Sequence, residues 1–198
     1  MKYFFSSIAL GAMVSFSACQ SGNKENTTQQ TEQQAAADPH AHAGAQPTAQ
    51  QAPAMAKDPA KSIPEFTFYK VKSGIGFSKA DIPANRNTAF ILFDPSCGHC
   101  QHEASLLAKN YAKVKDVNIY FVSMNDPALM ASFLETFAKE LVDKPNVEVL
   151  YDRNQQFIQK FHVPVQFPAN YIYGADGQLK NSWDGEKEIG YILAEYSK

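Results

Sequence analysis

Two runs of apolar residues constrain the fold of this chain more than any other feature. They are Ala89–Phe93, which is wholly apolar, and Val117–Val122, which is interrupted only by Asn118. Runs of this length and composition are typical of strands buried on both faces, as in a parallel sheet covered by helices. Between them Leu107, Tyr111 and Val114 recur at helical spacing. The sequence therefore predicts two parallel central strands joined through a helix.

The rest of the chain continues this alternation and then changes its pattern. Asp126-Pro127 predicts a helix start, with Asp as N-cap and Pro at the first helical position. The further predicted elements are a helix carrying Met130, Phe133, Leu134, Phe137 and Leu141, a strand 147–151, a helix 154–161, strands 171–173 and 179–183 flanking Ala175-Asp176-Gly177, and a helix 189–196. A βαβαβα unit followed by ββα predicts an α/β fold with a mixed central sheet and helices on both faces.

The N-terminal third has a different composition and predicts an exported protein. Residues 1–18 combine a basic start, a short apolar run and small residues, as in a secretory signal peptide. Cys19 follows Ser17-Ala18 and resembles the lipidated cysteine of a bacterial lipoprotein, although Phe16 departs from that pattern; an ordinary cleaved signal is the alternative. Residues 19–61 contain one large apolar side chain, Met55, and predict a disordered linker. The folded domain is then expected at 62–198.

The motif Cys97-Gly98-His99-Cys100 follows the first buried strand and precedes the predicted helix. A cysteine at a helix N-terminus faces free backbone N–H groups and the positive end of the helix dipole, which favour its thiolate form. We therefore expect Cys97 to be the nucleophile and Cys100, one turn further on, to resolve the mixed disulfide. His99, and the Gly98-His99 dipeptide as a whole, are expected to tune the reduction potential.

These features together resemble the thioredoxin fold, and more narrowly the TlpA/ResA-type membrane-tethered thiol–disulfide oxidoreductases. Besides the CxxC motif, the resemblance is carried by Ile63-Pro64-Glu65-Phe66, by Glu103, and by the segment from Pro168 to Gly177. It implies that Glu103 accepts a proton from Cys100. It also implies a cis peptide bond before Pro168, with Phe167 and Pro168 contacting the substrate. Pro164 is a rival for the role of Pro168.

The chain departs from this family pattern at three positions. Ser96 stands where the family usually has Trp, Ile91 where thioredoxins have a buried acid, and Ser105 where a proline is common in the first helix. These differences bear on redox tuning and on the choice of partner more than on the type of reaction.

Other functions remain to be weighed against disulfide exchange. A metal-binding or redox-sensing cluster of Cys97, Cys100, His99 and His102 is the alternative. There is no second cysteine pair, however, and His99 and His102 are expected to point away from the geometry in which both could bind one metal ion. A binding module without chemistry is disfavoured by the intact cysteine pair, and His40 and His42 in the linker are interpreted as solvated residues. No metal or other cofactor is predicted.

Charge and targeting define the expected partners. The formal net charge is −2 and no basic stripe points to nucleic acid. We expect exported proteins with disulfides or thiols as substrates, and a redox partner in the membrane or periplasm. The predicted location is the bacterial cell envelope, with the lipid anchor in the membrane and the domain facing the periplasm or the exterior.

Overall fold

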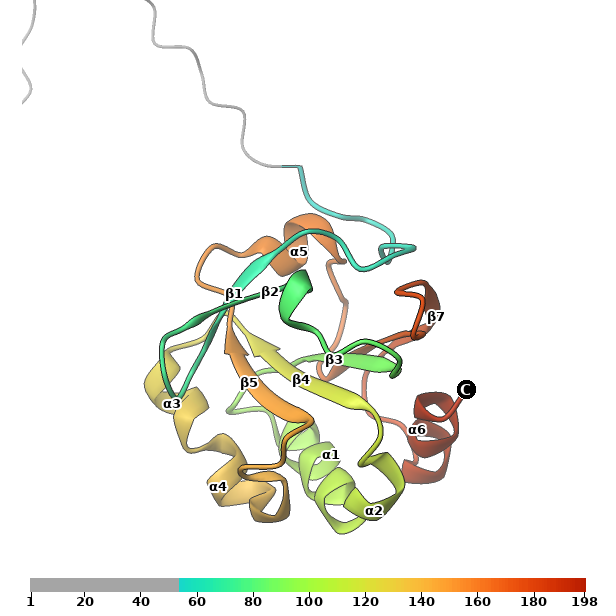
Figure 1. The fold of residues 1–198 in the computed structure, drawn as a ribbon. Helices are drawn as coiled ribbons and strands as arrows, with labels where there is room; N and C mark the ends of the chain where they lie inside the picture. Colours follow the sequence, from blue (N-terminus) through green and yellow to red (C-terminus); the bar gives the residue numbers. More distant parts are fainter. Residues whose placement is uncertain (1–53) are drawn as a thin grey trace, which may run out of the picture. The chain divides into compact units, whose positions relative to one another are not determined.

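The computed structural model describes residues 54–198, and these build one mixed sheet with helices on both faces (Figure 1). The sheet order is β2-β1-β5-β4-β3-β6-β7. The three central strands are parallel, because β4 pairs in parallel with both β3 and β5. All other pairs are antiparallel: β1 with β2 and β5, and β6 with β3 and β7. The strands are β1 Thr67–Lys70, β2 Gly76–Ser78, β3 Thr88–Leu92, β4 Asn118–Ser123, β5 Val147–Tyr151, β6 Ala169–Tyr173 and β7 Leu179–Asp184. The helices are η1 Lys79–Asp81, α1 Gly98–Lys109, α2 Tyr111–Val114, α3 Pro127–Ala131, α4 Phe133–Phe137, η2 Lys139–Leu141, α5 Gln156–Lys160 and α6 Ile189–Tyr196.

Alternation along the central strands divides the apolar side chains between two cores. Ala89 and Ile91 of β3 face the core beneath α1, α4 and α6, whereas Phe90 and Leu92 face the core beneath α5. Figure 1 shows these helices on opposite sides of the sheet. The α5 side is rich in stacked and edge-to-face aromatic rings, contributed by Phe66, Phe68, Phe77, Phe90, Tyr120, Phe157, Phe161, Tyr171 and Tyr173.

The predicted mixed α/β sheet is confirmed, and so are several local signals. The Asp126 side chain accepts a hydrogen bond from the Ala128 N–H at 2.8 Å and so caps α3, with Pro127 in its first turn. Gly177 adopts a φ of 74° in the turn that joins β6 to β7, where a residue without a Cβ is favoured. The last helix, α6, has the predicted bounds.

The sequence predicted where the helices lie but not where they are interrupted. The single helix expected after Asp126 is instead divided into α3, α4 and η2. Its apolar residues remain buried at helical spacing, but Ala138 leaves the helical region with φ −148° and ψ 50° and so ends α4. The helix after the CxxC motif likewise divides into α1 and α2 at Asn110.

The hairpin β1–β2 extends the sheet beyond the five predicted strands. Its strands have four and three residues, too few for a periodic pattern to stand out, and Gly74 allows the turn with a φ of 69°. The Ala56 N–H donates a hydrogen bond to the Ile158 carbonyl, and the Ala56 carbonyl accepts one from the Val163 N–H. Ala56 therefore already bonds to the domain, although it precedes the predicted domain start at Ser62. The predicted signal peptide, Cys19 and most of the linker lie outside the described residues.

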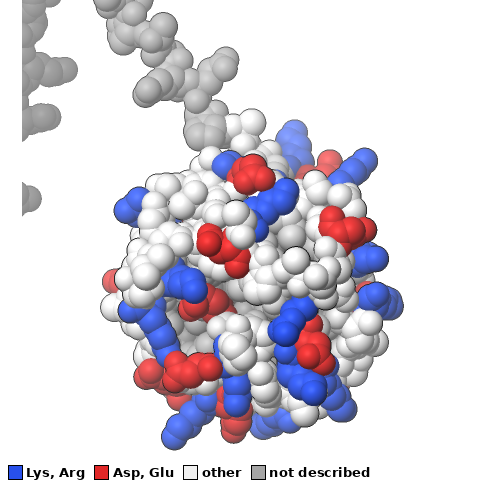
Figure 2. Space-filling view, viewed as in Figure 1, with Lys and Arg blue, Asp and Glu red and all other residues white. Residues whose placement is uncertain are grey.

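Charged side chains of both signs are interspersed over the face shown in Figure 2. Within residues 54–198, no helix combines the length and the apolar character needed to cross a bilayer.

Candidate active site

Cys97 and Cys100 lie at the start of α1, at the end of the buried strand β3. Cys97 is the N-cap residue, with extended backbone angles, and its N–H donates to the Asp94 carbonyl at 3.1 Å. Both cysteines are free thiols; Cys97 is half-buried, whereas Cys100 is 2% exposed. The predicted order of exposure, with an accessible first cysteine and a covered second one, is therefore present.

The environment of Cys100 opposes its ionisation. Burial raises the pKa of the Cys100 thiol far above its ordinary range, and the neighbouring Cys97 and Glu103 act in the same direction. A backbone hydrogen bond from Asp94 acts the opposite way but does not compensate. Cys100 therefore needs a proton acceptor nearby before it can act as a nucleophile.

Glu103 is a carboxylic acid held in the core close to that thiol. It lies one turn beyond Cys100 in α1 and is 1% exposed. Its Oε1 accepts a hydrogen bond from Asn170 Nδ2 at 2.9 Å, whereas its Oε2 has no partner. Burial raises the pKa of Glu103 to about 7, the hydrogen bond from Asn170 limits the rise, and the Glu186 charge adds to it. A group with this pKa exchanges protons readily at neutral pH.

Two residues that sequence reasoning missed complete this buried network. Asn170 comes from β6, where it lies opposite Ile91 of β3, and its Oδ1 accepts a hydrogen bond from the Tyr196 hydroxyl at 2.8 Å. Tyr196 is the last residue of α6. The sequence could have pointed to Asn170, because it is an amide inside an otherwise apolar strand. It could not have pointed to Tyr196, because a tyrosine at that position of the helix is also explained by packing in the core.

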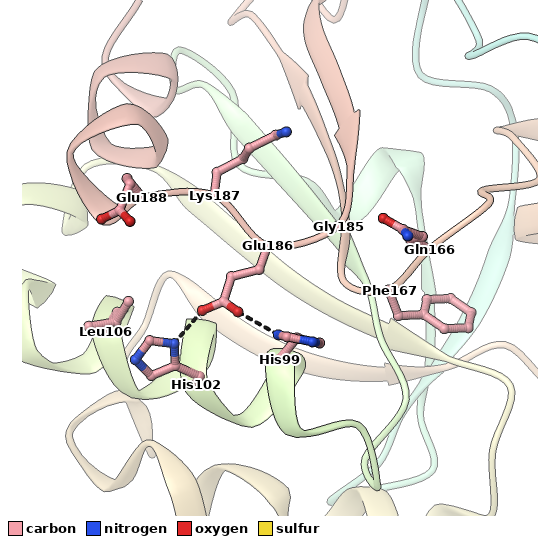
Figure 3. Close-up of a pocket in the computed structure, with 9 residues that line it drawn as sticks. All are labelled: His99, His102, Leu106, Gln166, Phe167, Gly185, Glu186, Lys187 and Glu188. Carbon is pink, nitrogen blue, oxygen red and sulfur yellow. Dashed lines mark hydrogen bonds and ion pairs between the residues drawn. The ribbon is translucent and has the colours of Figure 1, made fainter.

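Phe167 and Pro168 lie before β6, and the peptide bond between them is cis, as the resemblance implied. Phe167 is 37% exposed and lines a pocket of about 750 Å³ (Figure 3). The other residues that line it are His99, His102, Leu106, Gln166, Gly185, Glu186, Lys187 and Glu188. The pocket thus joins the first turns of α1 to the segment before Pro168 and to the loop between β7 and α6.

His99 and His102 both contact the carboxylate of Glu186. His99 Nδ1 lies 2.5 Å from Glu186 Oε2, and His102 Nδ1 contacts Glu186 Oε1 (Figure 3). Hydrogen bonds from His102 and His99 hold the pKa of Glu186 below its ordinary value. Positions three apart share a helix face, so a carboxylate from a distant loop reaches both rings. Sequence patterns do not reveal such a contact.

The structure shows what surrounds the three residues that depart from the family pattern. Ser96 is exposed, and its N–H and hydroxyl both bond to Asp94 Oδ1, at 2.7 and 2.6 Å. Ile91 is buried in the sheet, and Ser105 lies inside the uninterrupted helix α1.

Among residues 54–198, no group of three or more His, Cys, Asp or Glu side chains is arranged to hold a metal ion.

The comparison with known families rests on a match that spans most of the folded part. Residues 59–182 match the AhpC/TSA family, and this segment covers more than half of the chain. The chain belongs to the AhpC/TSA family. Among curated proteins, none matches this AhpC/TSA chain significantly.

Solved structures similar to this AhpC/TSA protein establish the thioredoxin-like fold. A secreted disulfide oxidoreductase of Mycobacterium tuberculosis, described as homologous to E. coli DsbE, has a TM-score of 0.54 and 22% identity, covering 67% of this chain and 94% of its own. A peroxiredoxin-like protein from Aquifex aeolicus has a TM-score of 0.56 and 15% identity, covering 72% and 87%. StoA from Bacillus subtilis has a TM-score of 0.51 and 12% identity, covering 67% and 96%.

Proposed function

We propose that this protein is a thiol–disulfide oxidoreductase that uses Cys97 and Cys100 as its dithiol/disulfide centre. The observation that carries the proposal is the arrangement of three side chains at the start of α1. Cys97 is accessible at the helix N-terminus, Cys100 is buried one turn further on, and Glu103, another turn along α1, is buried with one unpaired oxygen. This arrangement separates the attacking thiol from the resolving thiol and provides the latter with a base.

In the reducing direction the reaction has two balanced steps. The Cys97 thiolate attacks a substrate disulfide, forming a mixed disulfide and releasing one substrate thiolate. Cys100 then transfers its proton to the Glu103 carboxylate and attacks Cys97 Sγ. The Cys97–Cys100 disulfide forms and the second substrate thiolate leaves, so that two electrons pass from the protein to the substrate. A dithiol reductant must restore the cysteine pair, and the opposite net flow uses the same steps in reverse.

We assign the substrate contact to the edge of the pocket formed by Phe167 and Pro168. The exposed Phe167 ring offers an apolar contact to a polypeptide, and the segment lies next to the helix face that carries His99. The substrates are exported proteins with disulfides or thiols. Signal peptide 1–18 would direct export and then be removed, and lipidated Cys19 would hold the domain at the cell envelope through the linker. The secreted M. tuberculosis oxidoreductase with this fold supports such a location.

The test is reduction of a protein disulfide by the prereduced protein, followed as release of substrate thiols. Wild type should release two thiols for each cysteine pair oxidised, and Cys97→Ser should release none. If wild type releases no substrate thiols although alkylation shows that its own cysteines are reduced, the proposed activity is refuted.

The lipid anchor is tested separately, by membrane fractionation and by mass analysis of the lipid in wild type and in Cys19→Ala.

Peroxide reduction is a second candidate, favoured by the family match and by the peroxiredoxin-like structure from Aquifex aeolicus. Here the Cys97 thiolate would attack a peroxide O–O bond, forming a sulfenic acid and releasing an alcohol or water. Cys100 would condense with the sulfenic acid, giving the same disulfide and one water. Peroxide consumption measured beside disulfide reduction, with the same reductant, separates the two activities.

A further inference from the structure

The carboxylate proposed as proton acceptor is connected to the last helix through one buried amide. The Tyr196 hydroxyl donates to Asn170 Oδ1 at 2.8 Å, and Asn170 Nδ2 donates to Glu103 Oε1 at 2.9 Å. All three side chains are buried, at 1% exposure or less. The chain of bonds thus runs from α6 through β6 to α1.

The direction of these bonds decides what Asn170 offers to Glu103. An asparagine side chain has a donor end and an acceptor end of nearly the same shape, and a carboxylate accepts only from the donor end. A tyrosine hydroxyl that donates to the oxygen end turns the NH₂ end toward Glu103. Without that hydroxyl, the reversed amide would present its oxygen, which pairs only with the protonated acid.

We propose that Asn170 and Tyr196 are positioning residues that hold Glu103 ready to accept the proton of Cys100. Asn170 supplies the hydrogen bond that favours the carboxylate, and Tyr196 fixes the amide in the orientation that supplies it. This inference deepens the proposed function, because it rests on Glu103 as the base in disulfide exchange. Ile91 of β3, which lies opposite Asn170 in the sheet, has no polar group, and the hydrogen-bond partner of Glu103 comes from β6.

The charged and titratable groups around Glu103 come from its own helix and from two other parts of the fold. Cys100 shares its helix, the Tyr196 hydroxyl approaches from α6, and the Glu186 charge acts from the loop between β7 and α6. Glu186 itself is paired with His99 and His102. Of these contacts, only the one through Asn170 favours the charged carboxylate by a direct hydrogen bond.

The test follows the carboxyl carbon of Glu103 directly by ¹³C NMR, in the full reduced chain between pH 4 and pH 10. The resonance is identified as the one lost in Glu103→Gln. Wild type should titrate near pH 7. Tyr196→Phe, which removes one hydroxyl and keeps the ring, should raise the midpoint by about one pH unit, since a hydrogen bond favouring the charged form is lost. The ionised fraction at pH 7 should then fall from about half to about one tenth.

A matched control is available on the same helix. The Tyr191 hydroxyl accepts a hydrogen bond from Asn181 at 3.0 Å and is no part of the network, so Tyr191→Phe should leave the Glu103 midpoint unchanged. Asn170→Leu, nearly the same shape as asparagine, should raise the midpoint at least as far as Tyr196→Phe. The inference would be overturned if the titration midpoint of Glu103 in Tyr196→Phe were equal to, or lower than, the midpoint in Tyr191→Phe. The readout needs no substrate, so it is independent of whether the protein reduces disulfides.

Discussion

The buried Glu103 should make the stability of this protein fall as pH rises from acid to neutral. Its pKa is raised from the ordinary 4.5 to about 7 in the folded state, mainly by burial. The folded state therefore holds this proton more tightly than the unfolded chain does. Its stabilising contribution is complete below about pH 4.5 and is lost as pH rises through about 7. At about 1.4 kcal/mol per pKa unit, the loss is about 3 kcal/mol.

The perturbation that isolates this effect is Glu103→Gln, because glutamine resembles the neutral acid and still accepts the bond from Asn170. Urea unfolding of the reduced proteins, measured at intervals from pH 4 to pH 9, gives the free energy of unfolding of each. The difference between variant and wild type should be near zero at pH 4 and should reach about 3 kcal/mol in favour of the variant at pH 8.

A surface carboxylate provides the matched control. Glu140 is exposed, so Glu140→Gln should differ from wild type by the same small amount at every pH. If the Glu103→Gln difference stays constant with pH, or grows toward acid, then Glu103 does not hold its proton as described. The proton transfer from Cys100 would then need another acceptor.

Three further outcomes are expected. Cys100→Ser should accumulate mixed disulfides through Cys97, seen by mass spectrometry before and after reduction, whereas Cys97→Ser should accumulate none; the reverse pattern would exchange their roles. The reduction potential should lie between about −270 and −180 mV in glutathione or dithiothreitol buffers; a wild-type value well below −270 mV would contradict the reasoning. If His99 tunes this potential as the sequence predicts, His99→Ala should lower it by about 30 mV. Phe161→Ala, in the core beneath α5, should lower the free energy of unfolding by about 3–5 kcal/mol and leave the potential unchanged; a shift as large as that of His99→Ala would show that the two cores are coupled.

The sequence was sufficient for the order of the main elements because burial dictates their patterns. Strands buried on both faces are recognisable as apolar runs, and caps such as Asp126 depend only on neighbouring residues. The hairpin β1–β2 was missed because its strands are too short to show a period. The breaks at Asn110, Ser132 and Ala138 were missed because apolar spacing continues across them.

The candidate site was predictable only where it is local in sequence. Cys97, Cys100 and Glu103 fall within two turns of one helix, so spacing alone brings them together. Asn170, Glu186 and Tyr196 reach the same region from β6, from the β7–α6 loop and from α6. Their contacts depend on how distant elements pack, and a single sequence does not contain that information in readable form.

The network that ends at Tyr196 also bears on the order in which the protein matures. Synthesis delivers the chain from its N-terminus, so the cysteine pair emerges long before α6 does. Until α6 docks, Asn170 lacks its donor and Glu103 lacks an oriented partner. The proposed function then predicts that the cysteine pair is present in the nascent chain before Glu103 has its oriented partner, and that full exchange activity begins only when α6 has folded into place.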